Sequence, residues 1–189
     1  MTGLRSCAVV GALAGGLAAL LAGDAATVGF TLPGAGNEAG PPWTETKWPF
    51  LLDQWGTGLA FRCPAAHCGA EVYLYVRAKR GFCNCTTGVA DDEELDRVGD
   101  VDLLAPRFAP RAGGQPVTVG WMSGRSRPYH VDNASGPHSA LAIAFNDKCD
   151  VIVATVTTDR DTARNAERAA LDFLNGEAVM RWTKAELGL

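Results

Sequence analysis

The chain has 189 residues, of which 47% are hydrophobic and 20% charged, and its formal net charge is −4 at pH 7. A chain of this length can fold as one domain with a hydrophobic core. Because a basic surface supplies much of the affinity in nucleic-acid binding, the mildly acidic balance argues against a nucleic-acid partner.

The N-terminus has the pattern of a cleavable secretory signal peptide over residues 1–25. A short start with one base, Arg5, precedes an uncharged run of Ala, Leu, Val and Gly over residues 7–23. Spanning a membrane takes about 20 apolar residues, so this run fits a signal peptide better than an anchor, which is the competing interpretation. Small residues favour cleavage after Ala25, with Ala22 as the alternative. We therefore expect a bacterial protein that is periplasmic or secreted, with no membrane span after cleavage.

Residues 26–47 are rich in glycine and proline and poor in aliphatic side chains. This composition predicts a flexible lead-in, followed by one ordered domain over residues 48–189. Three tryptophans gather where order is expected to begin, namely Trp43, Trp48 and Trp55. Packing of these rings against the core is one interpretation, and an aromatic surface for a ligand or partner is the other.

The first part of the domain is predicted to contain strands and one short helix. One strand covers residues 58–63, and residues 71–78 alternate as a half-buried antiparallel strand does. Its aliphatic face holds Val72, Leu74 and Val76, and its other face holds Tyr73, Tyr75 and Arg77. Acidic residues fill the first turn of a helix predicted over residues 91–98, where the helix dipole favours negative charge. Prolines and glycines predict loops over 103–116 and 123–137, with a strand at 117–122 between them.

The C-terminal third has the clearest pattern. A strand over residues 139–145 alternates large apolar residues with alanines, and residues 149–157 are almost continuously apolar, as expected of a central strand. A helix with one apolar face is predicted over residues 159–175, before a short final segment that contains Trp182. The predicted fold is a single α+β domain, an antiparallel β-sheet with a C-terminal helix packed on one face.

Five cysteines remain once Cys7 leaves with the signal peptide: Cys63, Cys68, Cys83, Cys85 and Cys149. An oxidising compartment favours disulfides, each of which stabilises a fold by about 2–4 kcal/mol. An odd number leaves at least one thiol free. A Cys63–Cys68 bridge closes a small loop, and either Cys83 or Cys85 is then available to Cys149. A direct Cys83–Cys85 bridge is disfavoured because it strains the disulfide torsion.

The same cluster has a metal interpretation, with Cys63, His67, Cys68, Cys83 and Cys85 as ligands. Thiolates with an imidazole suit copper or zinc. This alternative requires a return of the chain that brings the two cysteine pairs together, and the spacing is not that of a standard zinc ribbon. Thiol–disulfide chemistry by the Cys83/Cys85 pair is a third interpretation. The leading interpretation, structural disulfides, needs no cofactor.

Charge is distributed unevenly in the middle of the chain. Residues 91–102 hold seven acids and one base, whereas residues 103–131 hold no acid. The second stretch contains Arg107, Arg111, Arg125, Arg127 and His130. Guanidinium groups bind carboxylates and phosphates bidentately, so an anionic ligand or acidic partner is one interpretation. Pairing of these arginines with the acidic helix is the other.

Catalytic patterns are weak in this sequence. Residues 120–124 are not a nucleophile elbow because the serine stands one place too late, and the three histidines lie in predicted loops. We therefore expect an exported, disulfide-stabilised accessory or binding protein without catalytic activity, which binds a protein partner or small ligand outside the cytoplasm. A periplasmic copper or other metal-handling protein is the first alternative, and a hydrolase-type enzyme is the second.

Overall fold

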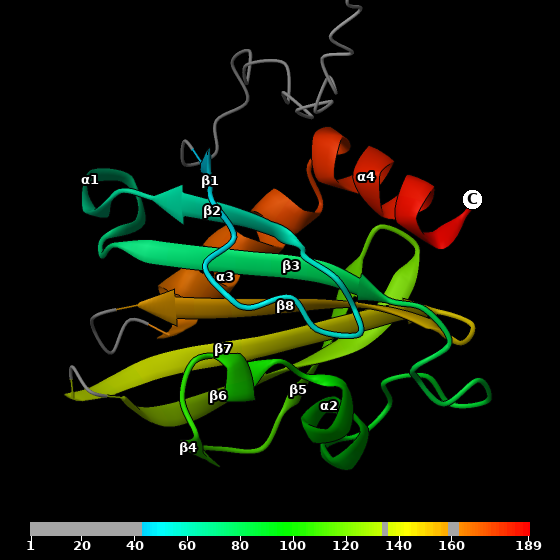
Figure 1. Ribbon diagram of the computed structural model, residues 1–189, viewed down its shortest axis with the longest axis horizontal. Coiled ribbons are helices and arrows are strands. Elements are labelled where there is room, and N and C mark those ends of the chain that lie inside the picture. Colours follow the sequence, from blue (N-terminus) through cyan, green and yellow to red (C-terminus); the bar gives the residue numbers. More distant parts are fainter. Residues whose placement is uncertain (1–42, 134–135, 159–162) are drawn as a thin grey trace, which may run out of the picture. The chain divides into compact units, whose positions relative to one another are not determined.

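The structure is a computed structural model that describes residues 43–133, 136–158 and 163–189. One antiparallel sheet of eight strands forms the centre of the described residues (Figure 1). Its strand order is β1-β2-β3-β8-β7-β6-β4, and β5 pairs with the same edge of β6 as β4 does. The strands are β1 Thr44–Thr46, β2 Leu59–Cys63, β3 Val72–Lys79, β4 Arg107–Pro110, β5 Gln115–Val119, β6 Met122–Asn133, β7 Gly136–Asp147 and β8 Asp150–Thr158.

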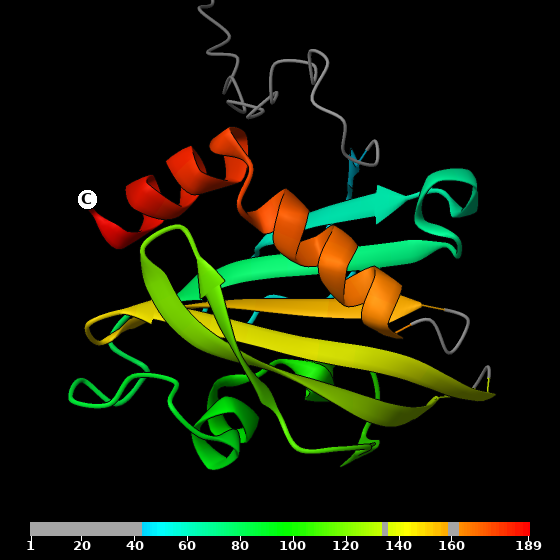
Figure 2. The same cartoon turned by 180° about the vertical axis from the view of Figure 1, so that it is seen from behind.

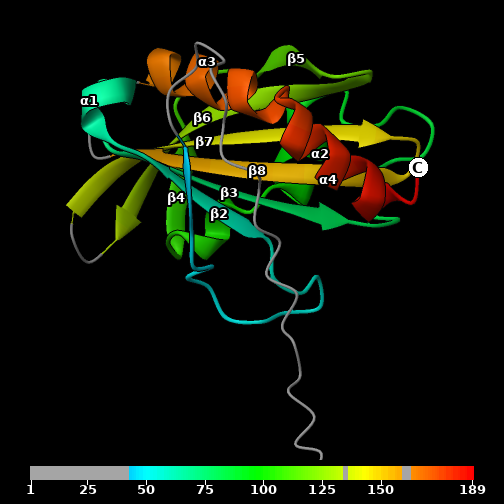
Figure 3. The same ribbon diagram turned by 90° about the horizontal axis from the view of Figure 1, so that it is seen from above.

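Helices lie on both faces of this sheet. Figure 2 shows the two C-terminal helices across one face, and Figure 3 shows the sheet between them and the segment of residues 47–58. We call the first surface the helical face and the second the charged face. The helices are α1 Ala65–Cys68, α2 Asp92–Val98, the 3-10 helix η1 Val101–Leu103, α3 Ala163–Leu174 and α4 Glu177–Leu187.

The helical face is a continuous apolar core. Alternating residues of β3, β7 and β8 point to it, and one stripe of α3 packs on them. Burying each such aliphatic or aromatic side chain stabilises the fold by about 1.5–3 kcal/mol. The core includes Phe61, Val72, Leu74, Val76, Leu141, Ile143, Phe145, Ile152, Val156, Ala170 and Leu174.

The charged face has a smaller apolar cluster. The β7 residues of this cluster are the alanines at positions 140, 142 and 144, and these short side chains let α2 and η1 approach the sheet closely. Leu95, Val98 and Val101 of these two helices are buried against them. The remaining space over β3 holds charged residues, as shown below.

The region of residues 103–137 differs from the prediction. The predicted loops contain β4, the start of β5 and nearly all of β6, while the predicted strand over 117–122 spans the turn between β5 and β6. Gly120 makes that turn with a φ of 59°. Glycine and proline were therefore misleading here, because both occur inside a long strand that pairs with β7 from Ser123 to Asn133.

Pro128 shows why β6 tolerates proline. The break between β4 and β5 lies opposite this residue, and its carbonyl accepts a bond of 2.9 Å from the backbone N–H of Arg111. The N–H and C=O of one strand residue point to the same side, so the missing N–H of proline faces this break. Its loss removes no hydrogen bond to β7, in which Leu141 is the partner of Pro128.

Most other predicted elements are confirmed. The structure has β2, β3, α2, β7 and β8 close to their predicted bounds, and Asp91 caps α2 by accepting a bond from Glu94. The fold fits the predicted α+β class, with C-terminal helices. A second one, α4, was not predicted, because Gly176 provides no side-chain cap to signal its start.

Two predicted segments include residues that the structure does not describe. The predicted signal peptide over residues 1–25 and the first residues of the predicted helix at 159–175 are both in this position. In the predicted lead-in of residues 26–47, β1 is present at Thr44–Thr46, before the predicted start of the domain. Among the described residues, no helix is long and apolar enough to cross a membrane.

Candidate binding site

Two disulfides stand at opposite ends of β3. Cys63 pairs with Cys68 beside α1, and Cys85 pairs with Cys149 at the turn between β7 and β8. Of the two partners considered for Cys149, the structure therefore has Cys85. Cys83 keeps a free thiol and is buried.

The five residues of the metal interpretation do not meet. Cys63 lies opposite Val72, at the start of β3, whereas Cys83 and Cys85 follow the end of that strand at Lys79. Seven residue steps at about 3.3 Å each separate the two ends by roughly 23 Å. The structure lacks the return of the chain that the metal interpretation requires, because β3 runs along the sheet between the two cysteine pairs. Within the part of the chain that the structure describes, no group of three His, Cys, Asp or Glu residues is placed to hold a metal ion.

The predicted anion-binding residues also separate into two groups. Arg125 and Arg127 lie on the charged face, next to α2. Arg125 is 2.6 Å from Asp92, and Arg127 is 2.7 Å from Asp96. Burial alone would lower the pKa of Arg127, but its bond to Asp96 raises it. These two arginines thus match the alternative in which the acidic helix pairs with them.

The other three residues lie where β4 meets β6. In the register of these strands Arg107 is opposite Asp132, and Ala109 is opposite His130. The guanidinium of Arg111 donates a bond of 3.3 Å to the Ser139 hydroxyl. Since side chains alternate across a strand, His130 points to the opposite face from Arg125 and Arg127. The five residues therefore do not form one anion site.

A cluster of four charged residues fixes the segment of residues 47–58 to the charged face. We call Asp53, Arg77, Lys79 and Asp100 the charge cluster. Two guanidinium nitrogens of Arg77 donate to the Asp100 carboxylate at 2.6 and 2.7 Å, and the third donates to both oxygens of Asp53 at 2.9 Å. Arg77 is only 2% exposed and Asp100 only 4%. One side chain of β3 therefore holds both η1 and the 47–58 segment.

Lys79 completes the cluster. Its ammonium group lies 2.7 Å from the Asp100 carboxylate and donates to the carbonyl of Val98 at the same distance. Burial alone would raise the pKa of Asp53, but bonds from the Trp55 N–H and Arg77 lower it. For Arg77, burial alone would lower the pKa, and the two carboxylates raise it. The four charges balance, so the cluster clamps this segment without leaving a net charge.

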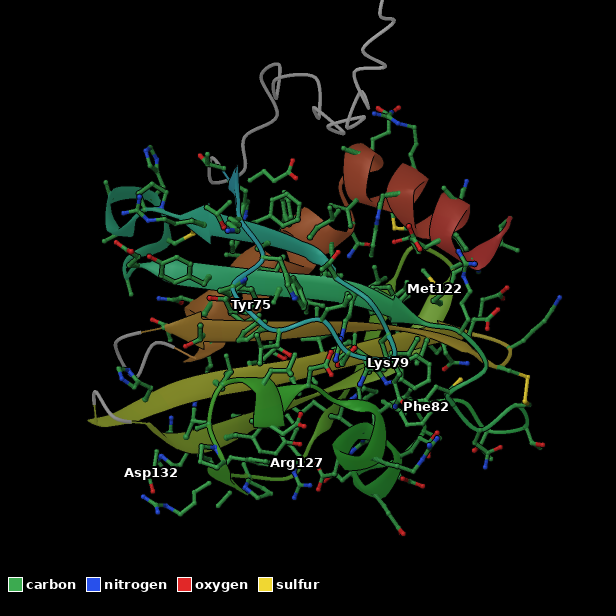
Figure 4. The ribbon with its side chains drawn as sticks, in the orientation of Figure 1. Tyr75, Lys79, Phe82, Met122, Arg127 and Asp132 are labelled. Carbon is green, nitrogen blue, oxygen red and sulfur yellow. A yellow bond between two sulfur atoms is a disulfide. The ribbon has the colours of Figure 1, made fainter. Side chains whose placement is uncertain are left out.

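Aromatic rings fill the space beside the charge cluster. Trp48 and Phe50 make edge contacts with Tyr75 of β3, with centroids 6.1 and 4.8 Å apart. Burial raises the pKa of Tyr75 to about 12. Trp55 packs on Phe82 at 4.5 Å, and the Lys79 ammonium lies 5.5 Å from the Phe82 ring. Figure 4 shows Tyr75, Lys79 and Phe82 along this side of the sheet.

The three tryptophans of the predicted aromatic surface pack mainly against other side chains of the domain. All three tryptophans are half-buried, and Trp43 packs on Phe173 of α3 at 5.0 Å. A cleft of about 240 Å³ opens beside the end of the segment. Its walls include Trp55, Thr57, Gly58, Ala78, Trp182 and Glu186.

The segment leaves two consecutive leucines in solvent. Leu51 is 91% exposed and Leu52 is 74% exposed, although the residues around them are fixed by Arg77 and by the aromatic contacts. Leu51 and Leu52 were not predicted from the sequence as binding residues. A usable signal was present, because two adjacent leucines between Pro49 and Asp53 have too little flanking periodicity to belong to a strand or helix.

Comparison with protein-family models gives no match for this chain, and comparison with curated proteins gives none either. Functional inference therefore rests on the geometry of the chain itself. The arrangement offers two exposed apolar side chains on a fixed segment, which suits binding better than bond-making chemistry.

Proposed function

We propose that the protein is an exported, disulfide-stabilised binding domain that holds a protein partner through Leu51 and Leu52. The observation that carries this proposal is their exposure, 91% and 74%, on a segment that is otherwise anchored. Two adjacent exposed leucines on a fixed segment offer an apolar surface that a partner can cover. The partner's surface would be an apolar pocket of a protein.

The anchoring of the segment supports this proposal. Binding normally loses affinity to the ordering of flexible side chains and loops. Here the Arg77–Asp53 bonds and the contact of Phe50 with Tyr75 hold the backbone on either side of the leucines. Each leucine that becomes fully buried contributes about 1.5–3 kcal/mol. Two such anchors give enough binding energy for a weak or transient complex.

The disulfides support the exported location. Bridges such as Cys63–Cys68 and Cys85–Cys149 persist in oxidising compartments and are rare in the cytosol. The predicted signal peptide leads to the same compartment, because it directs the chain across the inner membrane. A partner is therefore expected in the periplasm or outside the cell.

Site-specific photo-crosslinking tests the proposal. A photoreactive amino acid is placed at position 51, and at Gln54 of the same segment as the matched control. With a cell-envelope extract of the producing bacterium, position 51 should give a discrete protein adduct. Excess wild-type protein should suppress this adduct, and excess Leu51→Ser/Leu52→Ser protein should not. Because both leucines are exposed, the double variant should keep the wild-type melting temperature.

Two results would contradict the proposal. Equal adducts from positions 51 and 54 would show that the crosslink does not depend on the leucines. Binding of the purified protein to lipid vesicles, lost in the double variant, would show that the leucines enter a membrane surface and not a protein.

A further inference from the structure

Three cysteines lie close together at the end of the sheet where β7 turns into β8. Cys85 and Cys149 form a disulfide. The backbone N–H of Cys83 donates to the carbonyl of Cys149 at 3.1 Å, and its Sγ lies 3.2 Å from the carbonyl oxygen of Lys148. Cys83 is 6% exposed, whereas Cys85 is exposed. A protected thiol thus stands beside an accessible disulfide.

Cys149 has two cysteines as neighbours, Cys85 through the disulfide and Cys83 through a backbone hydrogen bond. The backbone bond from Cys83 to Cys149 makes these two residues direct neighbours. The Cα atoms of Cys85 and Cys149 are 4.2 Å apart, and disulfides commonly form at Cα separations of about 4.4–6.8 Å, so a direct neighbour of Cys149 is a candidate partner for it. Only the short link through Asn84 separates the two competing cysteines. A shift of the bridge from Cys85 to Cys83 therefore needs only a local rearrangement.

We propose that Cys83, Cys85 and Cys149 form a thiol–disulfide exchange centre that reacts with low-molecular-weight disulfides. Cys83 loses its proton, and its thiolate attacks the Sγ of Cys149. The Cys83–Cys149 bond forms as the Cys85–Cys149 bond breaks, and Cys85 leaves as a thiolate. This exposed thiolate attacks the small disulfide, forms a mixed disulfide, and releases a small thiolate that takes up the proton. One protein thiol is consumed for each small thiol released.

The surroundings of Cys83 keep the centre slow at neutral pH. Burial raises the pKa of its thiol to about 11, and the carboxylates of Glu94 on α2 and Asp150 on β8 add to the effect. Arg97 on α2 lowers the pKa of this thiol. The carbonyl oxygen of Lys148, in the β7–β8 turn, accepts a hydrogen bond from the thiol. Because the thiolate is the reacting form, the exchange rate should rise about tenfold per pH unit between pH 7 and 10.

Peptide mapping of the exported protein after incubation with glutathione disulfide at pH 9 tests the proposal. The expected product carries glutathione on Cys85 and a Cys83–Cys149 bridge. Glutathione on Cys83 with an intact Cys85–Cys149 bridge would overturn the proposal, because it shows direct reaction of the buried thiol. A protein left unmodified after a day would overturn it as well.

Two matched serine variants give an independent readout. Cys85→Ser should form the Cys83–Cys149 bridge, so thiol counting on the unfolded variant should find no free thiol within residues 43–189. Cys83→Ser should keep the Cys85–Cys149 bridge and take up no glutathione. Two free thiols in Cys85→Ser would mean that Cys83 and Cys149 do not pair, and the proposal would then fail.

Discussion

The two faces of the sheet stabilise the fold in different ways. The helical face buries large aliphatic and aromatic side chains under α3 and α4. The charged face buries the alanines of β7 under α2 and η1 together with Tyr129 of β6, and over β3 it buries Arg77, Lys79 and Asp100. The stabilisation from hydrophobic burial is roughly proportional to the buried apolar area and does not depend on orientation. The stabilisation from a buried ion pair, by contrast, depends on the geometry of each of its bonds.

Because of this difference, one face mainly stabilises the domain and the other mainly positions the 47–58 segment. Many substitutions of similar volume are tolerated in an apolar core. The charge cluster is less tolerant, because each member is desolvated and relies on the others. In return, it fixes the 47–58 segment in one orientation through the Arg77–Asp53 pair. The helical face thus holds the domain together, and the charged face holds the proposed binding segment in place.

The largest expected effect is the loss of Asp100. An Asp100→Leu substitution leaves Arg77 and Lys79 buried without their shared carboxylate, and we expect a loss of about 3–5 kcal/mol in the free energy of unfolding. Urea denaturation measures this loss. Asp102→Asn is the matched control, because this residue of η1 is exposed, and its effect should stay within about 0.5 kcal/mol.

The same experiment can separate the two functions of the cluster. Replacing Arg77 and Lys79 by methionine in the Asp100→Leu background removes the unpaired charges, so much of the lost stability should return. The 47–58 segment should remain free of its clamp, and crosslinking at position 51 should weaken. A triple variant as unstable as Asp100→Leu alone would show that the cluster is not an electrostatic unit.

A smaller effect is expected from exchanging side-chain size between the faces. Ala142 of β7 is fully buried on the charged face, between Leu141 and Ile143, which point to the helical face. Ala142→Leu should cost about 1–3 kcal/mol, since α2 and η1 leave no room for the longer side chain. Thermal and urea denaturation measure this cost. A neutral result would mean that the charged face packs loosely.

Sequence patterns revealed the two faces unequally. The alternation of Val72, Leu74 and Val76 was enough to predict the apolar face of β3, because hydrophobic periodicity is a local signal. The same alternation placed Arg77 on the solvent side of a half-buried strand, and that was wrong, because Arg77 is buried. Its partners Asp53 and Asp100 are 24 and 23 residues away in the chain, and no local pattern marks such pairs. Both the charge cluster and the fixed 47–58 segment depend on these distant contacts.

The disulfide partner of Cys149 was likewise not predictable from local sequence patterns. Counting cysteines was enough to predict at least one free thiol, and the small Cys63–Cys68 loop was a local inference. Cys83 and Cys85 are separated by one residue, so their spacing does not distinguish them as partners of Cys149. The distinction depends on how residues 82–90 lie against the β7–β8 turn, which is a property of the folded sheet.

The smallest expected effect concerns an exposed ion pair at the edge of the charged face. Arg62 donates two bonds to Glu71, at 3.1 and 2.8 Å, and the Tyr73 hydroxyl also bonds to this carboxylate. These bonds, that of Arg62 first, lower the pKa of Glu71 to about 2. A depressed pKa stabilises the fold above the unfolded value of about 4.3, and this contribution is lost as the pH falls toward 2.

Arg62→Gln should therefore raise the pKa of Glu71 toward its ordinary range, which NMR titration of the carboxyl carbon would show. Because both side chains are solvated, the free energy of unfolding at pH 7 should remain nearly unchanged. Arg77→Gln removes a buried cation from the same face of the sheet, and it should by contrast destabilise the protein at every pH tested. If the two substitutions reduced stability equally, burial would not be what distinguishes the charge cluster from a surface ion pair.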